Sequence, residues 1–72
     1  MSDVQGRLRI LLDYWIEHNS EHEKEFRDWA DKATSLSNEV AQRLQKAAAK
    51  MVAVGDDLIK AREALRKEME GH

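Results

Sequence analysis

Cysteine and proline are both absent from this chain of 72 residues, and glycine occurs only three times. Without cysteine, the chain has no disulfide, no thiolate metal site and no cysteine nucleophile. A domain this short buries little of its surface, so it usually gains stability from a metal ion or from self-association when disulfides are absent. The lack of proline and the scarcity of glycine leave helices free to run long.

Blocks of one charge and long apolar runs are also absent. The 12 Lys and Arg residues nearly balance the 14 Asp and Glu residues, and no basic block is present to neutralise a phosphate backbone. We therefore expect no nucleic-acid partner. Apolar runs such as residues 10–12 are far too short to cross a membrane. The amino terminus lacks the features of a signal peptide, so we expect a soluble, cytoplasmic protein with no membrane association.

The second half of the sequence carries a regular apolar stripe. Its spacings alternate between four and three, as at the a and d positions of a heptad, through Val40, Leu44, Ala47, Met51, Val54, Leu58, Ala61 and Leu65. A row of small residues, Ala41, Ala48 and Gly55, runs beside this heptad stripe and would let a neighbouring backbone approach closely. The outward positions are mostly charged or polar, which predicts one long helix with a solvated face.

The first half is periodic as well. Residues seven apart form one row of Leu8, Trp15, His22, Trp29 and Leu36, and an adjacent row of Leu12, Asn19, Phe26 and Ala33. Two polar residues, Asn19 and His22, therefore interrupt an otherwise apolar stripe. A lone polar residue in such a stripe often determines the register and oligomeric state of packed helices.

Hydroxyl-bearing residues mark the predicted helix boundaries. Ser2 and Gln5 fit a capping box at the start of the first helix. Residues 34–37 contain the main cluster of Ser and Thr, and Ser37 is well placed to cap the second helix. We predict helices over about residues 3–33 and 38–70, joined by a turn at 34–37, in one domain covering residues 1–72.

A short connection makes two long helices antiparallel neighbours, so the predicted fold is an all-α helical hairpin. Folding at the turn places Asn19 beside Gly55 and His22 beside Met51. Two helices cannot surround the large side chains of these stripes, so we expect a homodimer of hairpins that forms a four-helix bundle. The expected core and interface residues are Leu8, Trp15, Phe26, Trp29, Leu44, Met51, Leu58 and Leu65.

The strongest chemical signal is the pair His18 and His22, which lie one turn apart on one helix face. Two imidazoles at this spacing can chelate one Ni, Co, Cu or Zn ion, with Glu21 and Glu25 as candidate oxygen ligands. The structural alternative is that His22 hydrogen-bonds Asn19 or a partner chain, because a competent metal site needs three or four ligands.

Known catalytic arrangements are absent from the sequence. The metalloprotease pattern His-Glu-x-x-His is not matched, because Asn19 rather than Glu follows His18. No combination of nucleophile, base and oxyanion donors can be read either. We therefore expect that the protein is not an enzyme.

Residues 11–22 resemble the L-x-x-W/M-x-x-HN-x-x-H opening of a small, uncharacterised family of helical-hairpin domains. The similarity continues through Phe26 and Ala30 and resumes at residues 55–58, where that family has Gly-Asn-Glu-x-Leu. In that family the hairpin often follows a histidine-rich segment, in small proteins that look related to nickel or cobalt handling. This sequence has no such segment, and Asp56 stands in place of the family's Asn. The resemblance implies a helical hairpin and favours metal binding by the histidine pair.

Two functions stay open. The first is a non-enzymatic interaction module that dimerises or binds an unidentified protein partner. The second is an accessory protein that binds a divalent transition metal through His18 and His22. The absence of cysteine and the small number of histidines favour the first, whereas the paired histidines within an apolar stripe favour the second.

Overall fold

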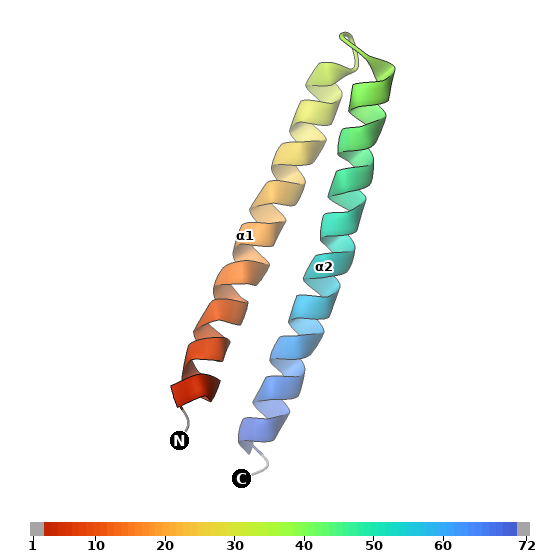
Figure 1. The fold of residues 1–72 in the computed structure, drawn as a ribbon. Helices are drawn as coiled ribbons and strands as arrows, with labels where there is room; N and C mark the ends of the chain where they lie inside the picture. The colour runs from red at the N-terminus through yellow and green to blue at the C-terminus, as the bar shows by residue number, and fades with distance from the viewer. Residues whose placement is uncertain (1–2, 71–72) are drawn as a thin grey trace.

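The computed structural model describes residues 3–70, which form two long helices packed side by side (Figure 1). Helix α1 spans Asp3–Ala33, and helix α2 spans Asn38–Glu70. The first turn of α1 and the last turn of α2 lie at the same end, so the helices are antiparallel. The predicted all-α helical hairpin is confirmed. The expected cap Ser2 lies outside the described residues.

The connection between the helices is closed by backbone hydrogen bonds and by a serine cap. The amides of Leu36 and Ser37 both donate to the carbonyl of Ala33, each at 2.9 Å, which ends α1. The Ser37 hydroxyl accepts a hydrogen bond of 3.2 Å from the amide of Val40. Its carbonyl accepts one of 3.1 Å from the amide of Ala41. Ser37 is therefore the N-cap of α2, as predicted.

Small residues line the contact between the two helices. Within residues 3–70, the buried side chains are Leu12, Asn19 and Ala30 on α1, and Ala41 and Ala48 on α2. Short side chains on α2 let the backbones approach closely. The row of small residues beside the heptad stripe is thus the part of α2 that faces α1. We call the two facing rows that run through the buried residues, one row on each helix, the contact line.

The heptad stripe of α2 is turned partly away from α1. Val40 and Val54 belong to this stripe, yet they remain 44% and 45% exposed. The sequence pattern predicted one continuous seam. In the structure, the leucines and the methionine of the stripe are half-buried, whereas the valines are exposed. The physical reason is that alanine and glycine permit a shorter distance between the helices than a row of valines would. The outer half of the stripe consequently lies beyond the reach of α1.

The hairpin is a single layer with no second layer behind it. Its extents are 55 × 15 × 12 Å, so its width is that of two helices and its depth is that of one. The accessible surface is 5715 Å², whereas a compact monomer of 8.3 kDa exposes about 4,600 Å². Within the described chain, neither helix is both long and apolar enough to span a membrane.

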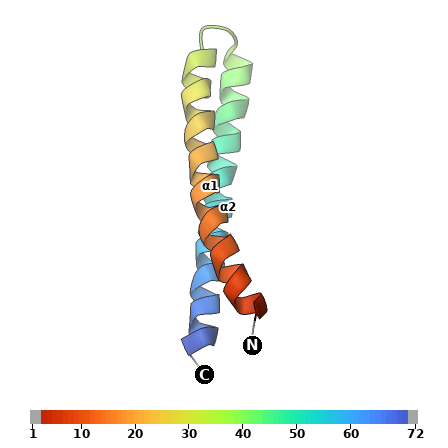
Figure 2. The ribbon, with the colours of Figure 1, turned by 90° about the vertical axis from the view of Figure 1, so that its left-hand side faces the viewer.

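The helices diverge at the end opposite the turn. Figure 2 shows the first turns of α1 swinging away from the last turns of α2. Near this end, Arg62 Nη1 lies 3.0 Å from Asp13 Oδ1 and links the two helices. Both side chains are largely exposed, so this ion pair contributes about 0–1 kcal/mol to stability.

Gly55→Ala should destabilise the hairpin, whereas Gly6→Ala should stabilise it. An added Cβ at Gly55 would lie 3.0 Å from Asn19 Nδ2, but nothing lies within 4 Å of the same position at Gly6. Alanine favours a helix interior over glycine by about 1 kcal/mol, which is the expected gain at Gly6. At Gly55 we expect a net loss of about 1 kcal/mol or more, because the contact is overpacked. Thermal unfolding followed by circular dichroism measures the change in stability of each variant. An equal rise in the midpoint temperature of both variants would contradict the close approach of Asn19 to Gly55.

Candidate functional site

Asn19 is the polar residue at the centre of the contact line. Its Nδ2 donates a hydrogen bond of 2.7 Å to the backbone carbonyl of Met51 on α2. The residue is 9% exposed, and Gly55 leaves the room that its amide needs. The predicted placement of Asn19 beside Gly55 is thus confirmed. A buried amide with a single acceptor on the opposite helix favours one alignment of the helices over its neighbours.

A ladder of aromatic rings runs along α1 and includes both histidines of the predicted metal pair. The ring centroids are 5.3 Å apart for Tyr14 and His18, 4.5 Å for His18 and His22, and 6.0 Å for His22 and Phe26. Residues four apart are displaced by about 40° around a helix. The ladder therefore winds from the exposed Tyr14 to the half-buried Phe26 at the contact line.

The two histidines face each other through the same ring nitrogen. His18 Nε2 and His22 Nε2 lie 3.0 Å apart. On the other side of each ring, Nδ1 faces a carboxylate, at 3.8 Å from Glu21 Oε1 and 3.2 Å from Glu25 Oε1. The two Nε2 atoms are within hydrogen-bond distance of each other, and which ring donates depends on its tautomer. Both Nε2 atoms converge on one point, as the two ligand atoms of a histidine chelate do.

The two glutamates do not join the histidines as a four-ligand cluster. Glu21 and Glu25 were expected as oxygen ligands, but each approaches Nδ1 and not the Nε2 that faces the other histidine. Among residues 3–70, no three His, Cys, Asp or Glu side chains are grouped so that they could hold a metal ion. One chain thus presents two imidazole nitrogens, with the carboxylates placed to orient them.

A broad apolar surface lies along one side of the hairpin, next to the histidine pair. On each helix, the residue three positions after a contact-line residue is rotated by about 60° around the helix axis, always in the same direction. Because the helices are antiparallel, this displacement leads to the same side of the hairpin on both. We call this surface the tryptophan face, and it comprises Trp15, His22 and Trp29 on α1 and Leu44, Met51, Leu58 and Leu65 on α2, with Val40, Ala47, Val54 and Ala61 farther out.

The tryptophan face is incompletely covered within one chain. Trp15 is 40% exposed and Trp29 is 59% exposed. The ammonium of Lys32 lies 4.4 Å from the centroid of the Trp29 ring and covers part of it. Of the predicted core and interface residues, the half-buried ones are Leu8, Phe26, Leu44, Met51, Leu58 and Leu65. One chain therefore leaves the two tryptophans exposed and buries none of the eight predicted residues fully.

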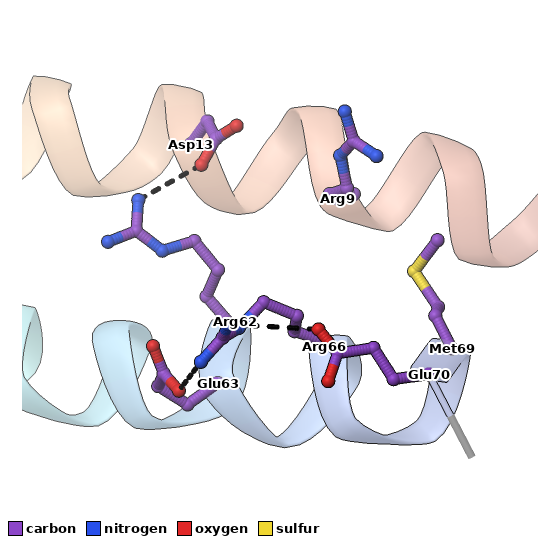
Figure 3. Close-up of a pocket in the computed structure, with 7 residues that line it drawn as sticks. All are labelled: Arg9, Asp13, Arg62, Glu63, Arg66, Met69 and Glu70. Carbon is purple, nitrogen blue, oxygen red and sulfur yellow. Dashed lines mark hydrogen bonds and ion pairs between the residues drawn. The ribbon is translucent and has the colours of Figure 1, made fainter.

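A groove of about 420 Å³ lies at the open end of the hairpin, lined by Arg9 and Asp13 from α1 and Arg62, Glu63, Arg66, Met69 and Glu70 from α2 (Figure 3). Its charges largely pair with one another. Arg66 contacts both Glu63 and Glu70, and the hydrogen bond and charge of Arg66 hold the pKa of Glu63 below its usual range. The groove is thus a network of exposed ion pairs, which stabilises the diverging ends only weakly.

Comparison with known proteins places the chain in a family. Residues 8–65 match a family described as a domain of unknown function, DUF8180. The chain belongs to this family. An uncharacterised protein of Archaeoglobus fulgidus is 40% identical over 55 residues, which make up 76% of this chain and 89% of that protein. No solved structure matches. Membership of an uncharacterised family, as predicted, is confirmed.

The DUF8180 match covers the features described above. It begins at Leu8 and ends at Leu65, so it includes Asn19, the histidine pair and all of the tryptophan face. Three of the seven groove residues, Arg66, Met69 and Glu70, lie beyond the match. Sequence reasoning missed this groove because its residues come from opposite ends of the chain. The local signals were the spacings of Arg66 from Glu63 and from Glu70, which are typical of ion pairs on one helix.

Replacing Asn19 by Leu should leave the DUF8180 hairpin helical but allow its two helices to pack in more than one register. The lost hydrogen bond to Met51 costs about 1 kcal/mol, and the new apolar contacts offset part of it. The expected result is a helical protein whose two Trp indole N–H groups give more than two NMR signals, because neighbouring registers become populated. Two sharp signals, together with unchanged circular dichroism, would show that Asn19 does not select the register.

Proposed function

We propose that this DUF8180 hairpin is a non-enzymatic self-association module. In this proposal the tryptophan face packs against the same face of a second copy, and the two hairpins form a four-helix bundle. The observation that carries the proposal is the exposure of Trp15 and Trp29 on a continuous apolar side of the molecule. Contiguous apolar surface of this kind marks an interaction site in proteins that are not membrane-embedded.

The amount of exposed surface supports a partner of the hairpin's own size. Relative to a compact monomer of 8.3 kDa, the chain exposes about 1,100 Å² more surface than its mass predicts. A standard protein interface buries about 800 Å² on each partner. The excess thus matches the contribution of one copy to a stable dimer.

The width of the apolar stripe on α2 also supports a bundle. A helix in a two-helix pair needs an apolar strip toward one neighbour, whereas a helix in a four-helix bundle packs against two. On α2 the row of Ala41 and Ala48 faces α1, and the row of Val40 and Val54 lies farther around the same helix. In the proposed bundle, the alanine row packs against α1 of the same chain and the valine row packs against α1 of the second copy.

Charges along the two edges of the tryptophan face favour a second copy as the occupant. Beyond the apolar residues, the helical positions place Glu21, Glu25 and Lys32 at the α1 edge and Arg43, Lys50 and Asp57 at the α2 edge. In a two-fold dimer with both turns at the same end, α1 of one copy lies beside α2 of the other. Glu25 of each copy then lies near the level of Lys50 of the other, which favours this arrangement over one in which α1 meets α1.

A second candidate function is the binding of a divalent transition metal by the histidine pair. The distance of 3.0 Å between His18 Nε2 and His22 Nε2 supports it, because the two nitrogens already converge. Calorimetric titration of chelator-treated protein with Ni, Co and Zn tests this function. Heat that is lost in both His18→Ala and His22→Ala would support it, and the absence of binding would refute it.

Trp29→Ala should weaken self-association far more than Ile10→Ala. Both residues are large, exposed and apolar in one chain, at 59% and 69% exposure. Ile10 lies on the side of α1 that points away from α2 and from the tryptophan face, so it is a matched control. We expect Trp29→Ala to raise the dimer dissociation constant roughly 30-fold or more, as for an interface hot spot.

The measurement is sedimentation equilibrium or light scattering over a range of protein concentrations in the presence of a chelator. A dimeric parent, a weakened Trp29→Ala variant and an unchanged Ile10→Ala variant would support the proposal. A parent that stays monomeric at high concentration would overturn it, as would equal effects of the two substitutions.

A further inference from the structure

We infer that the histidine pair is one half of a metal site that a second copy of the chain completes. In this site, His18 and His22 from two chains direct four Nε2 atoms at one Cu(II) or Ni(II) ion near the axis of the bundle. The inference rests on the proposed self-association and adds a ligand, a stoichiometry and a geometry to it.

The distance between the two nitrogens fits a right-angled pair of ligands better than a tetrahedral pair. With metal–nitrogen bonds of about 2.1 Å, two nitrogens separated by 3.0 Å subtend an angle of about 90° at the metal. A tetrahedral ion such as Zn(II) would need the nitrogens about 3.4 Å apart. Angles near 90° belong to the square-planar and tetragonal sites of Cu(II) and Ni(II), which also bind imidazole more tightly than earlier divalent metals do.

The position of His22 on α1 directs it toward the centre of the proposed bundle. His22 is displaced by about 60° from the contact line toward the tryptophan face, close to the direction of the bundle axis at about 45°. Adjacent helices pack 8–10 Å apart, so diagonal helices are about 11–14 Å apart. Side chains reach about 5–6 Å from a helix axis, so the two copies of His22 meet near the centre. His18 Nε2 is then also near the centre of the bundle, because it lies 3.0 Å from His22 Nε2.

The level of the pair along the hairpin lets the two pairs meet in either orientation of the second copy. His18 is the middle residue of α1, which spans Asp3–Ala33. In a dimer that overlaps along its full length, the two pairs therefore lie at the same level whether the turns are at the same end or at opposite ends. Charge complementarity at the edges selects the first arrangement, and the second would still bring the pairs together.

The carboxylates around the pair supply orientation and charge. Glu25 Oε1 is 3.2 Å from His22 Nδ1, and Glu21 Oε1 is 3.8 Å from His18 Nδ1. A carboxylate on Nδ1 keeps the proton there and leaves Nε2 as the ligand. Four such carboxylates from two chains place negative charge around a divalent ion, which compensates for its transfer into the bundle.

The test uses chelator-treated protein titrated separately with CuCl₂, NiCl₂ and ZnCl₂. Three quantities are measured together: the ion-to-chain ratio by calorimetry, the mass by light scattering, and the fluorescence of Trp15 and Trp29. We expect one Cu(II) or Ni(II) ion per two chains, a dimeric mass, quenching of the tryptophan fluorescence by the bound ion, and weaker binding of Zn(II). His22→Ala should abolish this binding, and His72→Ala, which alters the third histidine, should retain it.

The outcomes separate the site from the self-association on which it rests. A metal-free dimer that binds one ion per chain, or binds none, would overturn the shared site and leave the self-association standing. A chain that is monomeric without metal but dimeric with one ion per two chains would support the site and overturn metal-independent association. Binding that survives in His22→Ala but is lost in His72→Ala would assign the ion to the C-terminal histidine and overturn the inference.

Discussion

The hydrogen bond from Asn19 Nδ2 to the Met51 carbonyl is the polar contact on which the alignment of the two helices depends. A side chain as short as Asn reaches the backbone of α2 because Gly55 has no Cβ and the neighbouring contact residues are alanines. Close packing at this level turns the row of small residues toward α1. The larger residues of α2 are thereby displaced to the side, where they form half of the tryptophan face.

The same close packing explains why one chain leaves its largest side chains uncovered. Alanine and glycine bury little apolar area, so the contact line contributes less hydrophobic stabilisation than a row of leucines would. The bulky residues Trp15 and Trp29 lie outside the contact line and need another layer to cover them. In the proposed dimer, stability and association would be coupled, because the residues with the most apolar area are those that a single chain leaves exposed.

The aromatic ladder connects the chemistry of α1 to this assembly. Its rings pass from Tyr14 through the two histidines to Phe26, so the histidines lie at the boundary between solvent and the tryptophan face. A second copy would place the pair close to the new core, where charge is costly unless it is balanced. Glu21 and Glu25, beside the Nδ1 atoms, would provide that balance for the proposed metal ion.

The sequence by itself determined the two helices, their antiparallel pairing, the cap at Ser37 and the placement of Asn19 beside Gly55, because these follow from local periodicity and from the shortness of the turn. It also identified the histidine pair. Tertiary structure decided which row of α2 faces α1, that Glu21 and Glu25 face Nδ1, and that a groove of paired charges forms at the open end. Periodicity defines a stripe on a helix but not its rotation about the axis. That rotation depends on how closely two particular surfaces can approach, which is a property of the packed pair.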